Sequence, residues 1–153
     1  MARLTSVLER YIVFSWAIIG ACALVALYWA LDRSPPFVLL DYTVINATRG
    51  ETAYVNATVA RDTGRDCTVN FVRYLVDANK ARHDIGGTQY MTAAALRQME
   101  RDMPDSLRLA VRIPADVPGG PATLVTALEY RCNPMHVLWP IDVMMLIELK
   151  VLP

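Results

Sequence analysis

One uncharged run of 21 residues, at positions 11–31, constrains this 153-residue chain more than any other feature. The run contains no proline and a single glycine, Gly20. As a helix rising about 1.5 Å per residue it would span about 31 Å, which is close to the roughly 30 Å hydrocarbon thickness of a bilayer. Charged residues bracket it, at positions 9–10 before the run and 32–33 after it. Residues 11–31 therefore predict a single transmembrane helix.

Aromatic residues near both ends of the run suit the two membrane–water interfaces. The residues predicted to anchor the helix in the bilayer are Tyr11, Trp16, Gly20, Tyr28 and Trp29. Two arginines and the amino terminus precede the helix, whereas Arg33 is the only cation close after it. The positive-inside rule then predicts a cytoplasmic segment over residues 1–10 and a periplasmic or extracellular C-terminal domain, with the helix in the inner membrane of a cell.

Other interpretations of the run remain open from the residues alone. A buried core helix would usually show a polar face, and an ordinary signal peptide has a shorter apolar core of about 7–15 residues. The tetrapeptide at positions 19–22 looks like a bacterial lipobox, whose cysteine is lipidated after cleavage, although the chain stays apolar to residue 31. Small residues recur every four positions at Cys22, Ala26 and Ala30, a spacing that favours self-association of the helix into a homo-oligomer.

The rest of the chain divides into a short linker and a β-rich domain. Residues 32–36 end in two prolines, which fix φ and donate no backbone hydrogen bond, so a stiff linker is expected there. Residues 52–60 alternate between apolar and polar side chains, the period of a half-buried strand. The predicted strands are residues 37–45, 52–60, 67–76, 106–113, 122–132 and 141–152, and the domain covers residues 37–153.

Two segments carry more specific expectations. Residues 92–103 place apolar side chains at helical spacing, with Thr92 available as a cap and Pro104 as a terminator, and so predict one short helix. In the final segment, residues 143–147 are apolar on both faces, which predicts a central strand covered on both sides.

Short strands separated by Gly/Pro turns describe an antiparallel β-sandwich with one helical insert. Together with the Tyr-x-Cys pattern at residues 130–132, this layout resembles immunoglobulin-like domains, at the level of architecture, and is similar to small N-terminally anchored sandwich proteins of bacteria and their phages. In such a domain Cys67 and Cys132 would lie on the neighbouring antiparallel strands C and F. The resemblance therefore implies a disulfide between them, in an oxidising compartment, with two free buried thiols as the alternative.

No catalytic motif is present, and we expect no enzyme. A copper site is the sharpest chemical alternative, because one loop after a predicted strand holds a thiol, a thioether and an imidazole, as cupredoxin loops do. Its ligands would be His83, Cys132, His136 and Met144, but Cys132 cannot both bind copper and form the disulfide. Otherwise we expect no metal and no cofactor, and the loop is interpreted as a contact loop through Met135, His136 and Trp139.

The chain balances 15 basic against 15 acidic residues, so it offers no basic surface for nucleic acid. We expect a single-pass protein whose partners are the lipid bilayer and other membrane or periplasmic proteins. Its domain would make protein contacts as an accessory, structural or assembly subunit of a membrane complex. The alternatives are a periplasmic copper-binding, cupredoxin-like module and a virion or phage-encoded membrane protein.

Overall fold

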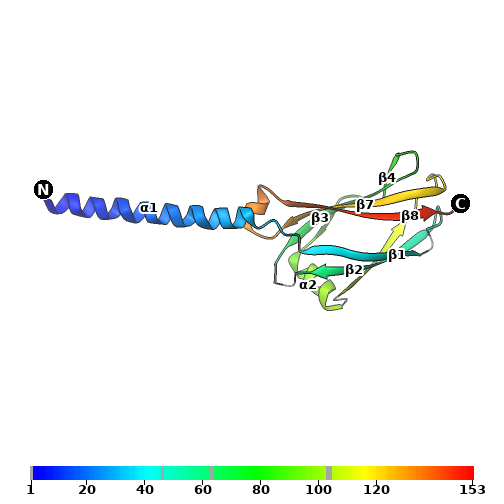
Figure 1. Ribbon diagram of the computed structural model, residues 1–153, viewed down its shortest axis with the longest axis horizontal. Helices are drawn as coiled ribbons and strands as arrows, with labels where there is room; N and C mark the ends of the chain where they lie inside the picture. The colour runs from blue at the N-terminus through cyan, green and yellow to red at the C-terminus, as the bar shows by residue number, and fades with distance from the viewer. Residues whose placement is uncertain (1, 46, 63, 103–104) are drawn as a thin grey trace.

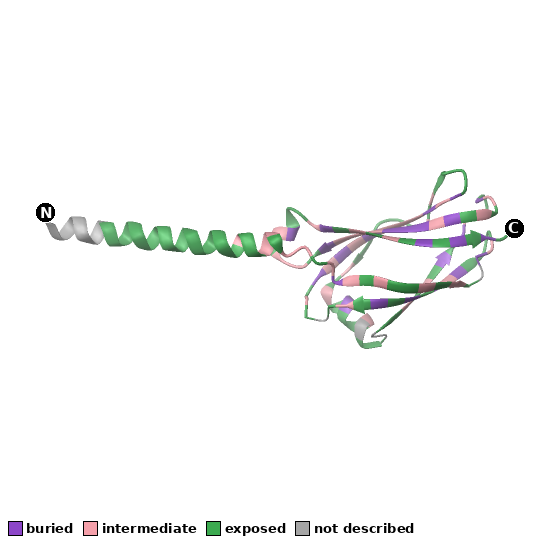
Figure 2. Ribbon diagram, in the orientation of Figure 1, coloured by how far each residue is buried: buried purple, intermediate pink, exposed green. Residues whose placement is uncertain are grey.

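The computed structural model describes residues 2–45, 47–62, 64–102 and 105–153, and it consists of one long helix followed by a β-rich domain (Figure 1). Helix α1 (Ala2–Leu31) leaves one end of the domain, and the carboxyl terminus lies at the other end. Its part from Glu9 to Leu31 is long and apolar enough to cross a membrane, and Figure 2 shows that this part is exposed along nearly all of its length. The predicted apolar helix is therefore present, and it begins earlier than residue 11.

The domain is built from two antiparallel sheets. One sheet has the strand order β1-β2-β6 and the other has the order β4-β3-β7-β8, with β5 also paired to β3. The strands of the first sheet are β1 (Phe37–Ile45), β2 (Thr52–Arg61) and β6 (Ser106–Arg112). Those of the second are β3 (Thr68–Val76), β4 (Arg82–Asp84), β5 (Gln89–Met91), β7 (Gly120–Arg131) and β8 (Ile141–Val151).

Side chains from both sheets form the core. The alternation predicted for β2 is confirmed, since Ala53, Val55, Ala57 and Val59 are all buried. A larger cluster joins β2 and β6 to the parts of β3, β7 and β8 that lie farther from α1. A smaller cluster, around Phe71 and Tyr130, lies next to the helix-bearing end and includes Leu96. Burial of the phenol raises the pKa of Tyr130, whose ring stacks on Phe37 at 6.1 Å between centroids.

The predicted helical insert is present as α2 (Ala93–Asp102). Thr92 caps it as expected, because its Oγ1 accepts a 3.2 Å hydrogen bond from the Ala95 amide. The predicted end of the helix, Met103 and Pro104, lies outside the described residues. Strands β4 and β5 were not expected from the sequence, since three residues each are too few to show a period.

The prediction that the last strand is central is wrong. Among the described residues β8 pairs along its length only with β7, so it is an edge strand of its sheet. Its outward apolar side chains are uncovered, and Met144 and Leu146 are 70% and 55% exposed. Apolar residues on both faces of β8 thus mark one buried face and one open face.

Candidate functional site at the helix–domain junction

A single helical turn follows β7 and meets the end of α1. This 3₁₀ turn, η1 (Pro134–Val137), is capped by Asn133, whose Oδ1 accepts hydrogen bonds from the amides of Met135 (3.0 Å) and His136 (3.2 Å). Pro134 occupies the first position, where its missing N–H costs nothing. The local sequence Asn-Pro therefore forms the turn and directs the His136 ring toward α1.

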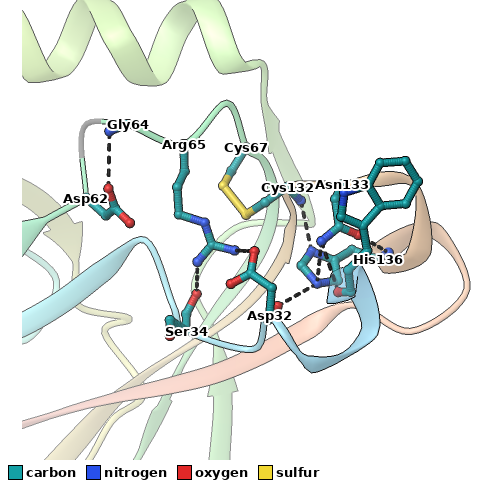
Figure 3. The surroundings of a disulfide bond; sticks show 10 residues. Asp32, Ser34, Asp62, Gly64, Arg65, Cys67, Cys132, Asn133 and His136 are labelled. Atoms are coloured by element: carbon teal, nitrogen blue, oxygen red, sulfur yellow. Dashed lines mark hydrogen bonds and ion pairs between the residues drawn. A yellow bond between two sulfur atoms is a disulfide. The ribbon is translucent and has the colours of Figure 1, made fainter. Parts of the chain in front are cut away.

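His136 is the centre of the junction and is only 1% exposed. Its Nδ1 accepts a hydrogen bond from the Cys132 amide at 3.2 Å, so the ring proton is on Nε2. Nε2 then donates to the Asp32 carbonyl at 2.9 Å (Figure 3). Because both ring nitrogens are used inside the protein, His136 is a structural link between domain and linker. His136 was predicted as part of a contact loop, and in the folded chain its side chain is buried within that loop.

The domain also satisfies backbone groups at the end of α1. The last carbonyls of a helix have no partner within the helix, and they need one from elsewhere. Asn133 Nδ2 donates to the Trp29 carbonyl at 3.1 Å. In return, the Arg33 guanidinium donates to the carbonyls of Trp139 and Pro140, each at 2.7 Å, and lies 4.3 Å from the centroid of the Trp139 ring. Side chains from the domain and from the linker therefore hold the end of α1 against the domain.

The disulfide lies beside these contacts. Cys67 and Cys132 are bonded, with their Cα atoms 4.0 Å apart, at the ends of β3 and β7 that pair through Thr68 and Arg131. From the segment that leads into Cys67, Arg65 forms an ion pair with Asp32 at 2.5 Å and donates to the Ser34 carbonyl (Figure 3). The disulfide thus joins the two segments of the domain that bind the linker.

The copper set does not assemble. The sulfur of Cys132 is held in the disulfide and is not available as a thiolate ligand. His83 lies on β4 opposite Leu75, seven residues along β3 from Thr68, or about 23 Å at 3.3 Å per residue. There it contacts Asp77, Nε2 to Oδ2 at 3.1 Å. Across the described residues, no group of three or more His, Cys, Asp and Glu side chains is placed to hold a metal ion.

The exposed part of the junction is the end of the η1 loop. Of the predicted contact residues, Trp139 is 60% exposed and Met135 is partly buried. Two residues that were not predicted are more exposed than Trp139, namely Val137 at 64% and Leu138 at 82%. Three successive apolar residues at positions 137–139, shortly after an Asn-Pro cap, were the signal for this tip, since a short turn has too few positions to bury them all.

The predicted anchor residues lie along α1. Tyr11, Trp16 and Tyr28 are exposed, with Trp16 at 68% and Tyr28 at 72%, and Gly20 has no neighbour within 4 Å of an added Cβ. Trp29 is partly covered by the domain. Cys22 is an exposed free cysteine on the same helix.

No known protein-family model matches this chain, and no curated protein is significantly similar to it in sequence.

Proposed function

We propose that this is a single-pass protein of the inner membrane that holds an immunoglobulin-like β-sandwich outside the cytoplasm and presents it to other membrane or periplasmic proteins, as an accessory, structural or assembly subunit. The observation that carries the proposal is the closed junction. The domain provides the hydrogen-bond donors for Trp29 and Asp32 at the end of an otherwise exposed apolar helix. A freely tethered domain needs no such contacts, whereas a domain that presents one face at a membrane depends on them.

The strand order supports the immunoglobulin-like sandwich. The orders β1-β2-β6 and β4-β3-β7-β8 correspond to A-B-E and C′-C-F-G of that architecture, with α2 at the chain position of strand D. The disulfide joins the ends of the strands that correspond to C and F. A bridge of this kind persists in oxidising compartments, which favours placing the domain outside the cytoplasm.

The tip of the junction supports contact with the bilayer. Leu138 and Trp139 are exposed on η1, which lies beside the last turn of α1 (Figure 1). If α1 spans the bilayer, this tip is at the level of the lipid headgroups. Tryptophan is enriched at that level because its ring is amphipathic.

The outer face of the five-stranded sheet is the surface that we propose for the protein partner. Two rows of apolar side chains cross it at paired positions of β3, β7 and β8, and they are Val72, Ala127 and Met144, followed by Tyr74, Val125 and Leu146. A shallow hollow of about 390 Å³ includes the first row. Met144 and Leu146 are exposed, Val72, Tyr74 and Ala127 are partly buried, and Val125 is buried. Exposed apolar side chains on such a face are typical of interaction sites.

Site-specific photo-crosslinking in native membranes tests this function. A benzophenone amino acid is placed at Met144, on the proposed contact face. The matched control places it at Thr58, which is exposed on β2 of the other sheet. We expect a heavier, discrete adduct from position 144 and none of that mass from position 58. Protease added from outside the inner membrane should digest the domain.

Two results would contradict the proposal. Identical adduct patterns from positions 144 and 58 would mean that the outer face has no specific partner. Protection of the domain in intact spheroplasts, with digestion only after lysis, would place it in the cytoplasm and refute the orientation.

A further inference from the structure

A second hollow, called the cleft below, lies between the two sheets of the domain and has a volume of about 240 Å³. It is lined by side chains of both sheets and of α2, and most of them are apolar. The residues that matter here are Phe71, Met91, Met99, Leu109, Tyr130 and Met145. The cleft adjoins the smaller core cluster, next to the helix-bearing end of the domain.

Two arginines, Arg73 and Arg108, line this otherwise apolar cleft. Arg108 is exposed, and its guanidinium lies over the Tyr54 ring, 4.6 Å from the centroid. Arg73 lies on the inner face of β3, in the alternation that also points Phe71 and Leu75 inward. Its Nε is buried and has no hydrogen-bond partner among the described residues, and no carboxylate of the described residues lies within ion-pair distance. The guanidinium carbon of Arg73 lies 4.7 Å from the centroid of the Phe71 ring, a cation–π contact. Desolvation by burial lowers the pKa of Arg73.

A second unsatisfied polar atom lies directly beside Arg73. Thr126 of β7 is the paired neighbour of Arg73 on one side and of Met145 on the other. It is 4% exposed, and its Oγ1 is buried without a hydrogen-bond partner among the described residues. Buried polar groups in folded proteins are nearly always paired, because an unpaired one costs about 1–3 kcal/mol. Arg73 lines the cleft and Thr126 does not, so the unpaired Nε of Arg73 is the donor that an acceptor group in the cleft would satisfy.

We propose that the cleft binds a single-chain alkyl carboxylate, with its carboxylate on Arg73 and its chain among the apolar side chains between the sheets. The anionic head follows from the donors, since a guanidinium carries only N–H donors and prefers carboxylates. The single short chain follows from the volume, which is below the roughly 300–1,000 Å³ of drug-sized pockets and leaves no room for a two-chain lipid.

Three methionines that line the cleft make the proposal testable by NMR. The full-length chain, with ¹³C-labelled methionine methyl groups, is placed in phosphatidylcholine nanodiscs and titrated with decanoate. We expect saturable shifts of the Met91, Met99 and Met145 methyl resonances. Met144 is the internal control, because it lies on the opposite face of the sheet and is 70% exposed. Decanol and decyltrimethylammonium are titrated as probes with the same chain and a neutral or cationic head.

Variants then test the role of the guanidinium. Arg73→Leu should weaken decanoate binding about tenfold or more, as loss of a charged hydrogen bond predicts, and should abolish the preference for decanoate over decanol. Arg73→Lys should retain that preference. The matched control is Arg82→Leu, which makes the same change in net charge on the outer face, where Arg82 lies over Tyr74. It should bind decanoate like the wild type.

The proposal is overturned if decanoate shifts Met144 as much as the three cleft methionines, which would indicate partition into the bilayer. It is also overturned if the wild-type protein binds decanol or the ammonium probe as tightly as decanoate. That comparison needs no variant, so it decides the matter even if Arg73→Leu does not fold. An absence of any saturable shift would mean that water fills the cleft.

Discussion

Removing the Cys67–Cys132 disulfide should lower the free energy of unfolding by about 4 kcal/mol. The two cysteines are separated by 65 positions, and loop closure over that length removes about 14.5 cal/mol/K of entropy from the unfolded chain, or about 4 kcal/mol at 25 °C. The folded state should change little, because β3 and β7 remain paired through all nine residues of β3. For a domain of this size the loss corresponds to a fall in Tm of roughly 12–20 °C.

The assay is thermal unfolding of the full-length chain in nanodiscs, followed by near-ultraviolet circular dichroism. The variant replaces both Cys67 and Cys132 with alanine, and reduction of the wild-type protein should lower its Tm by a similar amount. The matched control is Cys22→Ala, which removes the free cysteine and should leave Tm unchanged. A fall of less than about 3 °C in the double variant would refute the loop-closure reasoning, because the folded contacts alone would then hold the domain.

Three further outcomes are expected. Hydrogen bonding from His83 lowers the pKa of Asp77 below the ordinary value of an aspartate, so the carboxylate's contribution to stability is present above that ordinary value and is lost as the pH falls through the lower, folded pKa. The difference in urea midpoint between wild type and Asp77→Asn should therefore be larger at pH 5 than at pH 3. Gly50 has φ 78° in the turn between β1 and β2, and Gly50→Ala should cost about 1–2 kcal/mol in urea unfolding. An environment-sensitive fluorophore at Leu138 should be quenched by brominated lipids, whereas the same label at Thr58 should not be, in a chain without other free thiols.

Local periodicity predicted the parts of the fold that depend on one segment at a time. The inner face of β2 follows from a strict period of two. The disulfide joins residues 65 positions apart, and it was implied by the resemblance to immunoglobulin-like domains and not by a local pattern. The position of β8 could not be obtained in this way. Apolar residues on both faces do not distinguish a strand covered on both sides from an edge strand with one open face.

The role of His136 could not be predicted for a different reason. Its hydrogen bond to Asp32 joins residues 104 positions apart, so no local pattern contains it. Imidazole, thiol and thioether in one loop suggest copper chemistry as readily as a structural link. The choice between them depends on where α1 ends relative to the loop, which only the folded chain determines.

The closed junction connects helix α1 to the proposed contact face. Rotation of the domain about the linker would break the bonds from Asn133 to Trp29 and from His136 to Asp32. At about 1 kcal/mol each, these two bonds alone favour the docked arrangement roughly thirtyfold, before the Arg65–Asp32 ion pair is considered. The direction of α1 therefore sets the direction in which the outer face of β3, β7 and β8 points. A partner that binds this face meets it in one orientation, which lowers the entropy lost on binding.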